Sequence, residues 1–131
     1  MKAILITLFS LIGFVANAQS VFILAKEQRA KELLVYELQK NRIELTEDMS
    51  SATYVIEVVM DEVKKNIFDG YIRLVKNSNN KELYKTETLK NKPRMGNGYN
   101  PQKAIVKDII EKKDFYAISD FLKKKAPLKV E

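Results

Sequence analysis

The sequence predicts an α+β domain: an antiparallel β-meander with an N-terminal helix and C-terminal helices packed on one face. Residues 25–41 have helical periodicity, residues 53–89 hold segments that alternate with period two, and Asn100-Pro101 begins a second helical region. Helices that precede and follow a run of strands are typical of this class.

The first element of this domain is a short apolar run at residues 21–24, which is either an edge strand or the lead-in to a helix. In residues 25–41, Ala30, Leu34 and Leu38 recur every four positions. Residues at that spacing share one face of a helix, so the pattern predicts a helix with an apolar stripe.

The sheet is expected to contain strands at residues 53–62, 71–76 and 82–89, together with a brief strand at residues 43–46. Residues 77–80 (Asn-Ser-Asn-Asn) predict a turn, because Asn tolerates left-handed backbone and bonds to its own main chain. The order of the strands in the sheet does not follow from these patterns.

One face of the strand at residues 53–62 is more apolar than the other. Its members are Tyr54, Ile56, Val58 and Met60. We therefore expect this face to cover the core, with the Ile56 side chain buried. Val55 and Val59 make the second face partly apolar as well, which indicates that it has some cover of its own.

Two helices are expected after residue 99. Asn100 is suited to cap the first, with Pro101 at the first helical position, where its missing N–H costs no hydrogen bond. Asp114 is expected to cap the second, which ends at Ala126-Pro127.

Residues 1–18 have the three parts of a cleavable secretory signal. Lys2 is followed by an apolar stretch at residues 3–15 and by the small residues Ala16-Asn17-Ala18, which predicts cleavage before Gln19. The alternatives are a membrane anchor, which would need about 20 apolar residues, and a buried core helix. Residues 19–131 then form a single exported domain, periplasmic or secreted, and the chain has no cysteine for a disulfide or a lipid anchor.

Positive charge is concentrated in residues 90–125, which hold ten lysine and arginine residues against four acidic ones. Within this region, residues 90–101 combine cations, glycines and a capped helix start, a combination that suits an anion. The candidate ligand-binding residues are Lys90, Lys92, Arg94, Gly96, Gly98 and Tyr99. The alternative is a solvated loop whose glycines and Asn cap simply make the turn into the helix.

Most catalytic chemistry is excluded because the chain has no His, Cys or Trp. Without them there is no His-based triad, no thiolate nucleophile and no zinc site of the usual kind, so we expect no metal and no cofactor. The remaining options are the carboxylates of Glu47-Asp48 and Asp61-Glu62, and a contact between Ser119 and Lys123. Solvated side chains are the expected account of all three, and a small carboxylate-dependent hydrolase is the alternative function.

Three segments resemble those of a group of known proteins: the leader that ends in Ala16-Asn17-Ala18 followed by Gln19, the run at residues 51–57 and the run at residues 70–75. Together they resemble uncharacterised small exported cell-envelope proteins of Bacteroidetes-type Gram-negative bacteria, built as a helix, a strand, a hairpin and a C-terminal helix. The resemblance implies an envelope or periplasmic accessory domain. It implies no catalytic or binding residue.

The sequence therefore favours an exported, non-enzymatic binding or accessory domain. Its expected partners are an anionic lipid headgroup, an acidic glycan or an envelope protein, because such groups oppose the basic C-terminal third outside the cytoplasm. A nucleic acid is not expected, since no nucleic-acid-binding fingerprint is present.

We predict that the mature protein begins at Gln19, because signal peptidase requires small residues just before its cleavage site and Ala16 and Ala18 supply them. Intact-mass analysis of the protein purified from its native host measures this directly. Retention of residues 1–18 would contradict the prediction.

Overall fold

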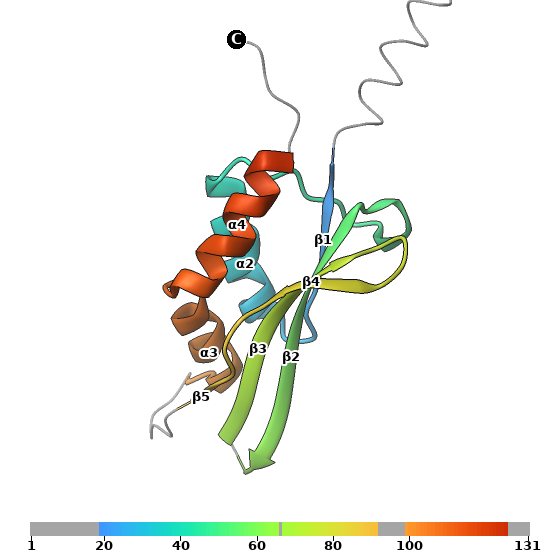
Figure 1. Ribbon diagram of the computed structural model, residues 1–131. Coiled ribbons are helices and arrows are strands. Elements are labelled where there is room, and N and C mark those ends of the chain that lie inside the picture. Colours follow the sequence, from blue (N-terminus) through green and yellow to red (C-terminus); the bar gives the residue numbers. More distant parts are fainter. Residues whose placement is uncertain (1–18, 66, 92–98, 126–131) are drawn as a thin grey trace, which may run out of the picture.

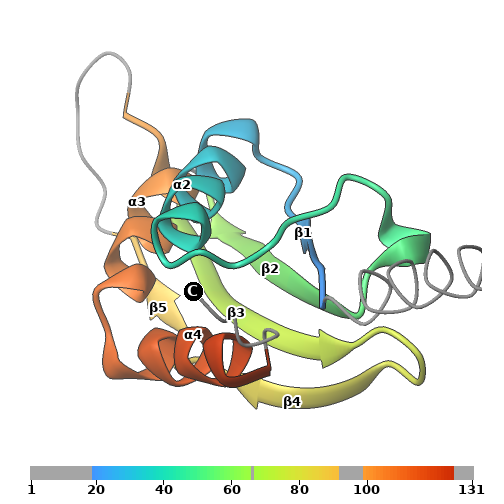
Figure 2. The ribbon, with the colours of Figure 1, turned by 90° about the horizontal axis from the view of Figure 1, so that it is seen from above.

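The computed structural model describes residues 19–65, 67–91 and 99–125. The predicted leader, and the predicted helix end at Ala126-Pro127, lie outside these residues. The described helices all lie on one face of a single twisted sheet, as Figures 1 and 2 show. The predicted α+β class and the placement of the helices are confirmed.

Among the described residues, five strands form the sheet: β1 (Val21–Leu24), β2 (Tyr54–Lys64), β3 (Ile67–Lys76), β4 (Lys81–Lys85) and β5 (Leu89–Lys90). The order is β1-β2-β3-β4, and β5 pairs with β3 below β4. β2, β3, β4 and β5 pair in antiparallel fashion, whereas β1 runs parallel to β2. The sheet is therefore mixed, which corrects the purely antiparallel expectation. A helix between β1 and β2 returns the chain to the same end of the sheet, and such a connection produces a parallel pair.

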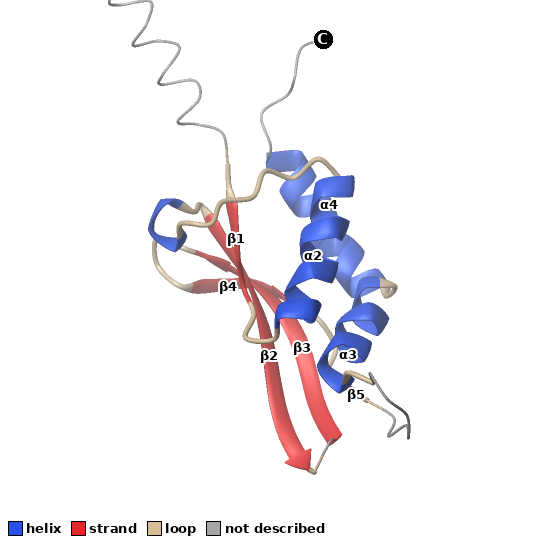
Figure 3. Ribbon diagram, turned by 180° about the vertical axis from the view of Figure 1, so that it is seen from behind, coloured by secondary structure: helices blue, strands red, loops and turns tan. Residues whose placement is uncertain are grey.

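The helices that cover one face of this sheet in the described part of the chain are α2 (Gln28–Lys40), α3 (Pro101–Ile110) and α4 (Lys113–Lys125), coloured blue in Figure 3. A short 3-10 turn, η1 (Met49–Ser51), lies before β2. No described helix combines the length and the apolar character needed to cross a membrane.

The caps largely follow the sequence. Asn41 follows the last residue of α2, and Asn100 caps α3 by accepting from the Lys103 N–H at 3.0 Å, with Pro101 at the first helical position. Asp114 lies inside the first turn of α4 rather than at its cap. Its carboxylate accepts from the Glu87 N–H at 2.8 Å and so ties α4 to the chain after β4.

The core lies between the sheet and the helices. Ile56, Ile72 and Leu74 come from the middle of the sheet and are fully buried. They belong to one apolar cluster with residues of α2, α3 and α4: Ala30, Leu34, Leu38, Ile105, Val106, Ile109, Phe115, Ile118 and Leu122. The prediction that Ile56 is buried is confirmed. Val55 and Val75 are buried on the opposite face, where they pair across β2 and β3.

The strand expected at residues 82–89 is interrupted at residues 86–88. The cause is Thr86, whose buried hydroxyl accepts from the Ile72 N–H at 2.9 Å while its own N–H donates to the Ile72 carbonyl at 2.8 Å. The side chain thus takes the place of a backbone acceptor, and strand pairing resumes only at Leu89. The brief strand expected at residues 43–46 is reduced to a bridge between Leu45 and Val21.

We predict that Ile56→Ala lowers the free energy of unfolding by about 2–5 kcal/mol, because it leaves a cavity in the centre of the core. Chemical denaturation followed by circular dichroism measures this change. Val63→Ala is the matched control on the same strand: Val63 is 47% exposed, so the substitution should change stability by less than about 0.5 kcal/mol. Equal effects of the two substitutions would contradict the burial of Ile56.

Candidate functional site

β2 is much longer than the strand beside it. β1 pairs with β2 only from Val21↔Tyr54 to Leu24↔Glu57, whereas β2 continues to Lys64. Within the described residues, no strand lies along β2 beyond Glu57 on the side away from β3. The lower half of β2 in Figure 1 is therefore an open sheet edge. We call residues 58–62 the open edge.

The direction of the backbone groups follows from two hydrogen bonds at the start of β2. The Thr53 carbonyl accepts from the Asn77 N–H at 3.0 Å, on the β3 side, and the Tyr54 N–H donates to the Ser20 carbonyl at 3.1 Å, on the β1 side. Along a strand, the N–H and carbonyl of one residue point to one side, and those of the next residue point to the other side. Met60 therefore directs both its N–H and its carbonyl towards the open edge, and the Val58 carbonyl points the same way.

β1 ends early because the chain turns into α2 directly after Leu24. Glu27 caps α2, and its two carboxylate oxygens accept from the Arg29 N–H at 3.0 and 3.1 Å. The side-chain amide of Asn100, the cap of α3, donates to the same carboxylate. Glu27 thus joins the starts of α2 and α3 and holds both beside the open edge.

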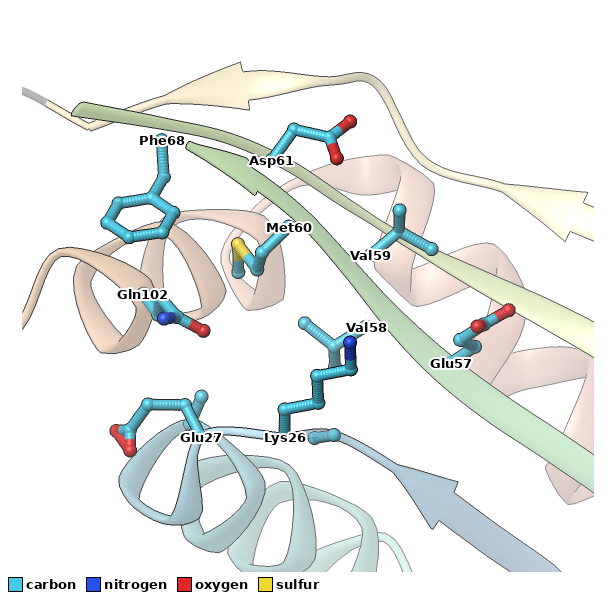
Figure 4. A pocket seen from close by; sticks show the side chains of 11 residues that line it. Lys26, Glu27, Glu57, Val58, Val59, Met60, Asp61, Phe68 and Gln102 are labelled. Atoms are coloured by element: carbon cyan, nitrogen blue, oxygen red, sulfur yellow. The ribbon is translucent and has the colours of Figure 1, made fainter. Parts of the chain in front are cut away.

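A cleft of about 320 Å³ lies between the open edge and these two helix starts. In Figure 4 the Met60 and Phe68 side chains point towards Gln102, and the Lys26 side chain extends towards Val58. Its lining combines apolar side chains with polar and charged ones. The lining residues are Ala25, Lys26, Glu27, Ala30, Glu57, Val58, Val59, Met60, Asp61, Phe68 and Gln102.

Charged side chains of the described strands form two rows on the sheet face that is turned away from the helices. In the upper row Arg73 lies between two acids, with its Nε 2.6 Å from Glu57 Oε1 and its Nη1 3.5 Å from Glu82 Oε1. The hydrogen bond to Glu57 raises the pKa of the Arg73 guanidinium above its usual value. In the lower row Asp61 lies directly opposite Asp69.

Two of the six predicted anion-binding residues are described, and each has a partner within the protein. Lys90 Nζ lies 4.0 Å from Asp69 Oδ1, and the Tyr99 hydroxyl accepts from the Asn91 side-chain amide at 3.3 Å. The other four, Lys92, Arg94, Gly96 and Gly98, lie outside the described residues. The helix start that they precede is already close to the Glu27 carboxylate, which would repel an added anion. Anion binding at residues 90–101 stays a prediction.

The residues considered for catalysis are dispersed. The Asp48 carboxylate accepts from the Ser50 N–H and hydroxyl, the latter at 2.7 Å, and so caps η1. Ser119 is 3% exposed, which corrects the expectation of a surface residue, while Lys123 is exposed. Activation of a serine requires a buried lysine. The described residues include no group of three or more acidic side chains that could hold a metal ion.

Two features of the site did not follow from the sequence: the open edge and the pairing of Asp61 with Asp69. Both depend on register, which the alternation of apolar residues leaves undetermined between neighbouring strands. A usable signal was the difference in length between the four-residue run at 21–24 and the much longer run that begins at residue 53.

Comparison with known proteins gives no family. No protein-family model matches the chain, and no curated protein matches it. Among solved structures, a PelC dodecamer from Paraburkholderia phytofirmans is similar with a TM-score of 0.45 and 13% identity, over 72% of this chain and 86% of that one. A lipoprotein candidate from Caulobacter crescentus has a TM-score of 0.40 and 17% identity, over 79% and 88% of the two chains. Likeness at this level assigns no function.

Proposed function

We propose that the chain is an exported, non-enzymatic accessory domain that binds a partner polypeptide along the open edge of β2. The observation that carries the proposal is the end of the β1–β2 pairing at Glu57, seven residues before β2 itself ends. An unpaired strand edge is a template for a further strand, and natural proteins either cover such edges or use them for binding.

The open edge supplies both parts of a strand-addition site. The Val58 carbonyl and the Met60 N–H and carbonyl are aligned to bond with an extended backbone, which provides affinity for any sequence. The cleft beside them accepts side chains from one face of the added segment, which provides selectivity. A segment of about five residues would span Val58 to Glu62, which is the usual length of a strand.

The edge is also held in place before any partner arrives. β3 pairs with β2 from Tyr54 to Lys64, and a register shift between Glu62 and Lys64 marks the far limit of regular pairing. Met60 packs over Gly70, where even a Cβ atom would meet the Met60 sulfur. A rigid edge loses little conformational entropy on binding, which favours affinity.

The leader at residues 1–18 supports an envelope or extracellular partner, and an envelope protein is therefore the proposed class of partner. Lipid headgroups and acidic glycans remain predicted ligands of residues 90–101. A carboxylate-dependent hydrolase remains the alternative. The acids that the sheet brings together, Asp61 and Asp69, lie on the face turned away from the helices, and the cleft at the open edge is lined by the first and not by the second.

Strand addition predicts that a peptide held near the open edge becomes ordered there. We would attach a capped eight-residue peptide of alternating valine and threonine, through a terminal cysteine, to the Gln102→Cys variant of the purified exported chain. The chain has no other cysteine, so the attachment is unique. The tether supplies an effective concentration in the mM range. We expect the Met60 amide proton to become protected from exchange, as measured by NMR.

Three controls make the result specific. The same peptide attached to Lys124→Cys, on the exposed face of α4, should leave the Met60 amide unprotected. Met60→Pro removes an N–H that points away from β3, together with the amide proton used as the readout, so addition is followed in this variant by the amide protons of the attached peptide, which should stay unprotected. If that variant unfolds, Lys26→Trp, which fills the cleft, replaces it. Absence of protection in the Gln102→Cys adduct would overturn the proposed function.

A further inference from the structure

On the sheet face turned away from the helices, the upper and lower rows of charged side chains differ in how their charges are paired. In the upper row a cation, Arg73, contacts an acid on each neighbouring strand: Glu57, directly opposite on β2, and Glu82, on β4 beside Lys85, which is the residue directly opposite. In the lower row the order from β5 to β2 is Lys90, Asp69, Asp61. Two carboxylates therefore face each other directly on neighbouring strands, an arrangement that is unfavourable.

Asp61 is the carboxylate at the end of this lower row. Lys90, on β5, compensates the negative charge of Asp69, with 4.0 Å between Nζ and Oδ1. Within the described residues, Asp61 has no ion pair, and its neighbour on the other side is the open edge. A strand added along that edge would place one residue directly opposite Asp61 and on the same face.

We infer that the polypeptide bound along β2 carries a lysine or an arginine opposite Asp61, and apolar residues on either side of that position. The inference rests on the proposed function. A cation there would pair with Asp61 across the strands as Arg73 pairs with Glu57 in the upper row. The residues before and after it point to the opposite face, as side chains alternate along a strand, and so meet Val58, Met60 and Phe68 in the cleft.

The chemistry of the cleft supports the same pattern. Its formal charges are one cation, Lys26, and three carboxylates, Glu27, Glu57 and Asp61. Because Glu57 is already paired with Arg73, the cleft keeps a formal charge of −1, on a chain whose net charge is +6. An extended segment with an acid opposite Asp61 would add a third carboxylate to the row, which is unfavourable. The site thus selects a basic partner segment although the chain itself is basic.

Competition between peptides tests this inference. Gln102→Cys would be equilibrated under thiol–disulfide exchange with three capped peptides that are identical except for lysine, glutamine or glutamate at the position opposite Asp61. Intact-mass analysis gives the proportion of each adduct. We expect lysine to exceed glutamine by about two- to fivefold, with glutamate the least abundant, since exposed cross-strand ion pairs have effects of this size.

Substitutions at Asp61 separate charge selection from other causes. Asp61→Asn should bring the three adducts to equal abundance, and Asp61→Lys should reverse their order. Asp120→Asn, which removes an exposed acid of α4, is the matched control and should leave the preference unchanged. Loss of the preference in about 0.5 M salt is also expected, because exposed charges are screened.

The outcomes separate the two proposals. Equal adducts with a protected Met60 amide would overturn the charge selection and leave strand addition intact. Adducts without protection of that amide would overturn the proposed function itself. A third result, dimerisation of the unmodified chain by light scattering with the Met60 amide already protected, would identify a second copy of this chain as the occupant and overturn the inference.

Discussion

The unequal length of β1 and β2 is the constraint on which the site depends. β1 ends at Leu24 because the next residues turn into α2, and Glu27 fixes that turn by capping α2 and accepting from the cap of α3. One carboxylate thus contacts the starts of both helices, beside the point where the parallel pairing stops. If β1 continued alongside β2 to its end, it would cover the Val58 carbonyl and the Met60 backbone, and the cleft would be filled.

The rest of the fold makes this interruption tolerable. β2 is held by β3 along its whole length, and the core beneath Ile56 is covered by α2, α3 and α4. The part of β2 that lacks a second neighbour therefore keeps its geometry without one. The end of β2 carries three charged side chains, Asp61, Glu62 and Lys64. Charged side chains on an edge strand disfavour pairing with unsuitable partners. An edge that is held rigid by its neighbouring strand and carries charged side chains is suited to selective strand addition.

Local patterns predicted the elements but not their register. The apolar stripe of Ala30, Leu34 and Leu38, the alternation around Ile56 and the Asn100-Pro101 start each depend on neighbouring residues, and each is found in the structure. The parallel pairing of β1 and the placement of Asp61 opposite Asp69 depend on residues distant in sequence. Thr86 shows a third limit of prediction from sequence. Its side chain takes the place of a backbone hydrogen-bond acceptor, and no pattern of residues predicts this role.

Amide hydrogen exchange along β2 of the free protein tests the central claim most directly. Val59 and Asp61 direct their N–H groups towards β3, whereas Met60 directs its N–H towards the open edge. We therefore expect slow exchange at residues 59 and 61 and fast exchange at residue 60, since protection follows hydrogen bonding. A Met60 amide as strongly protected as its two neighbours would show that the edge is already occupied and would contradict the account.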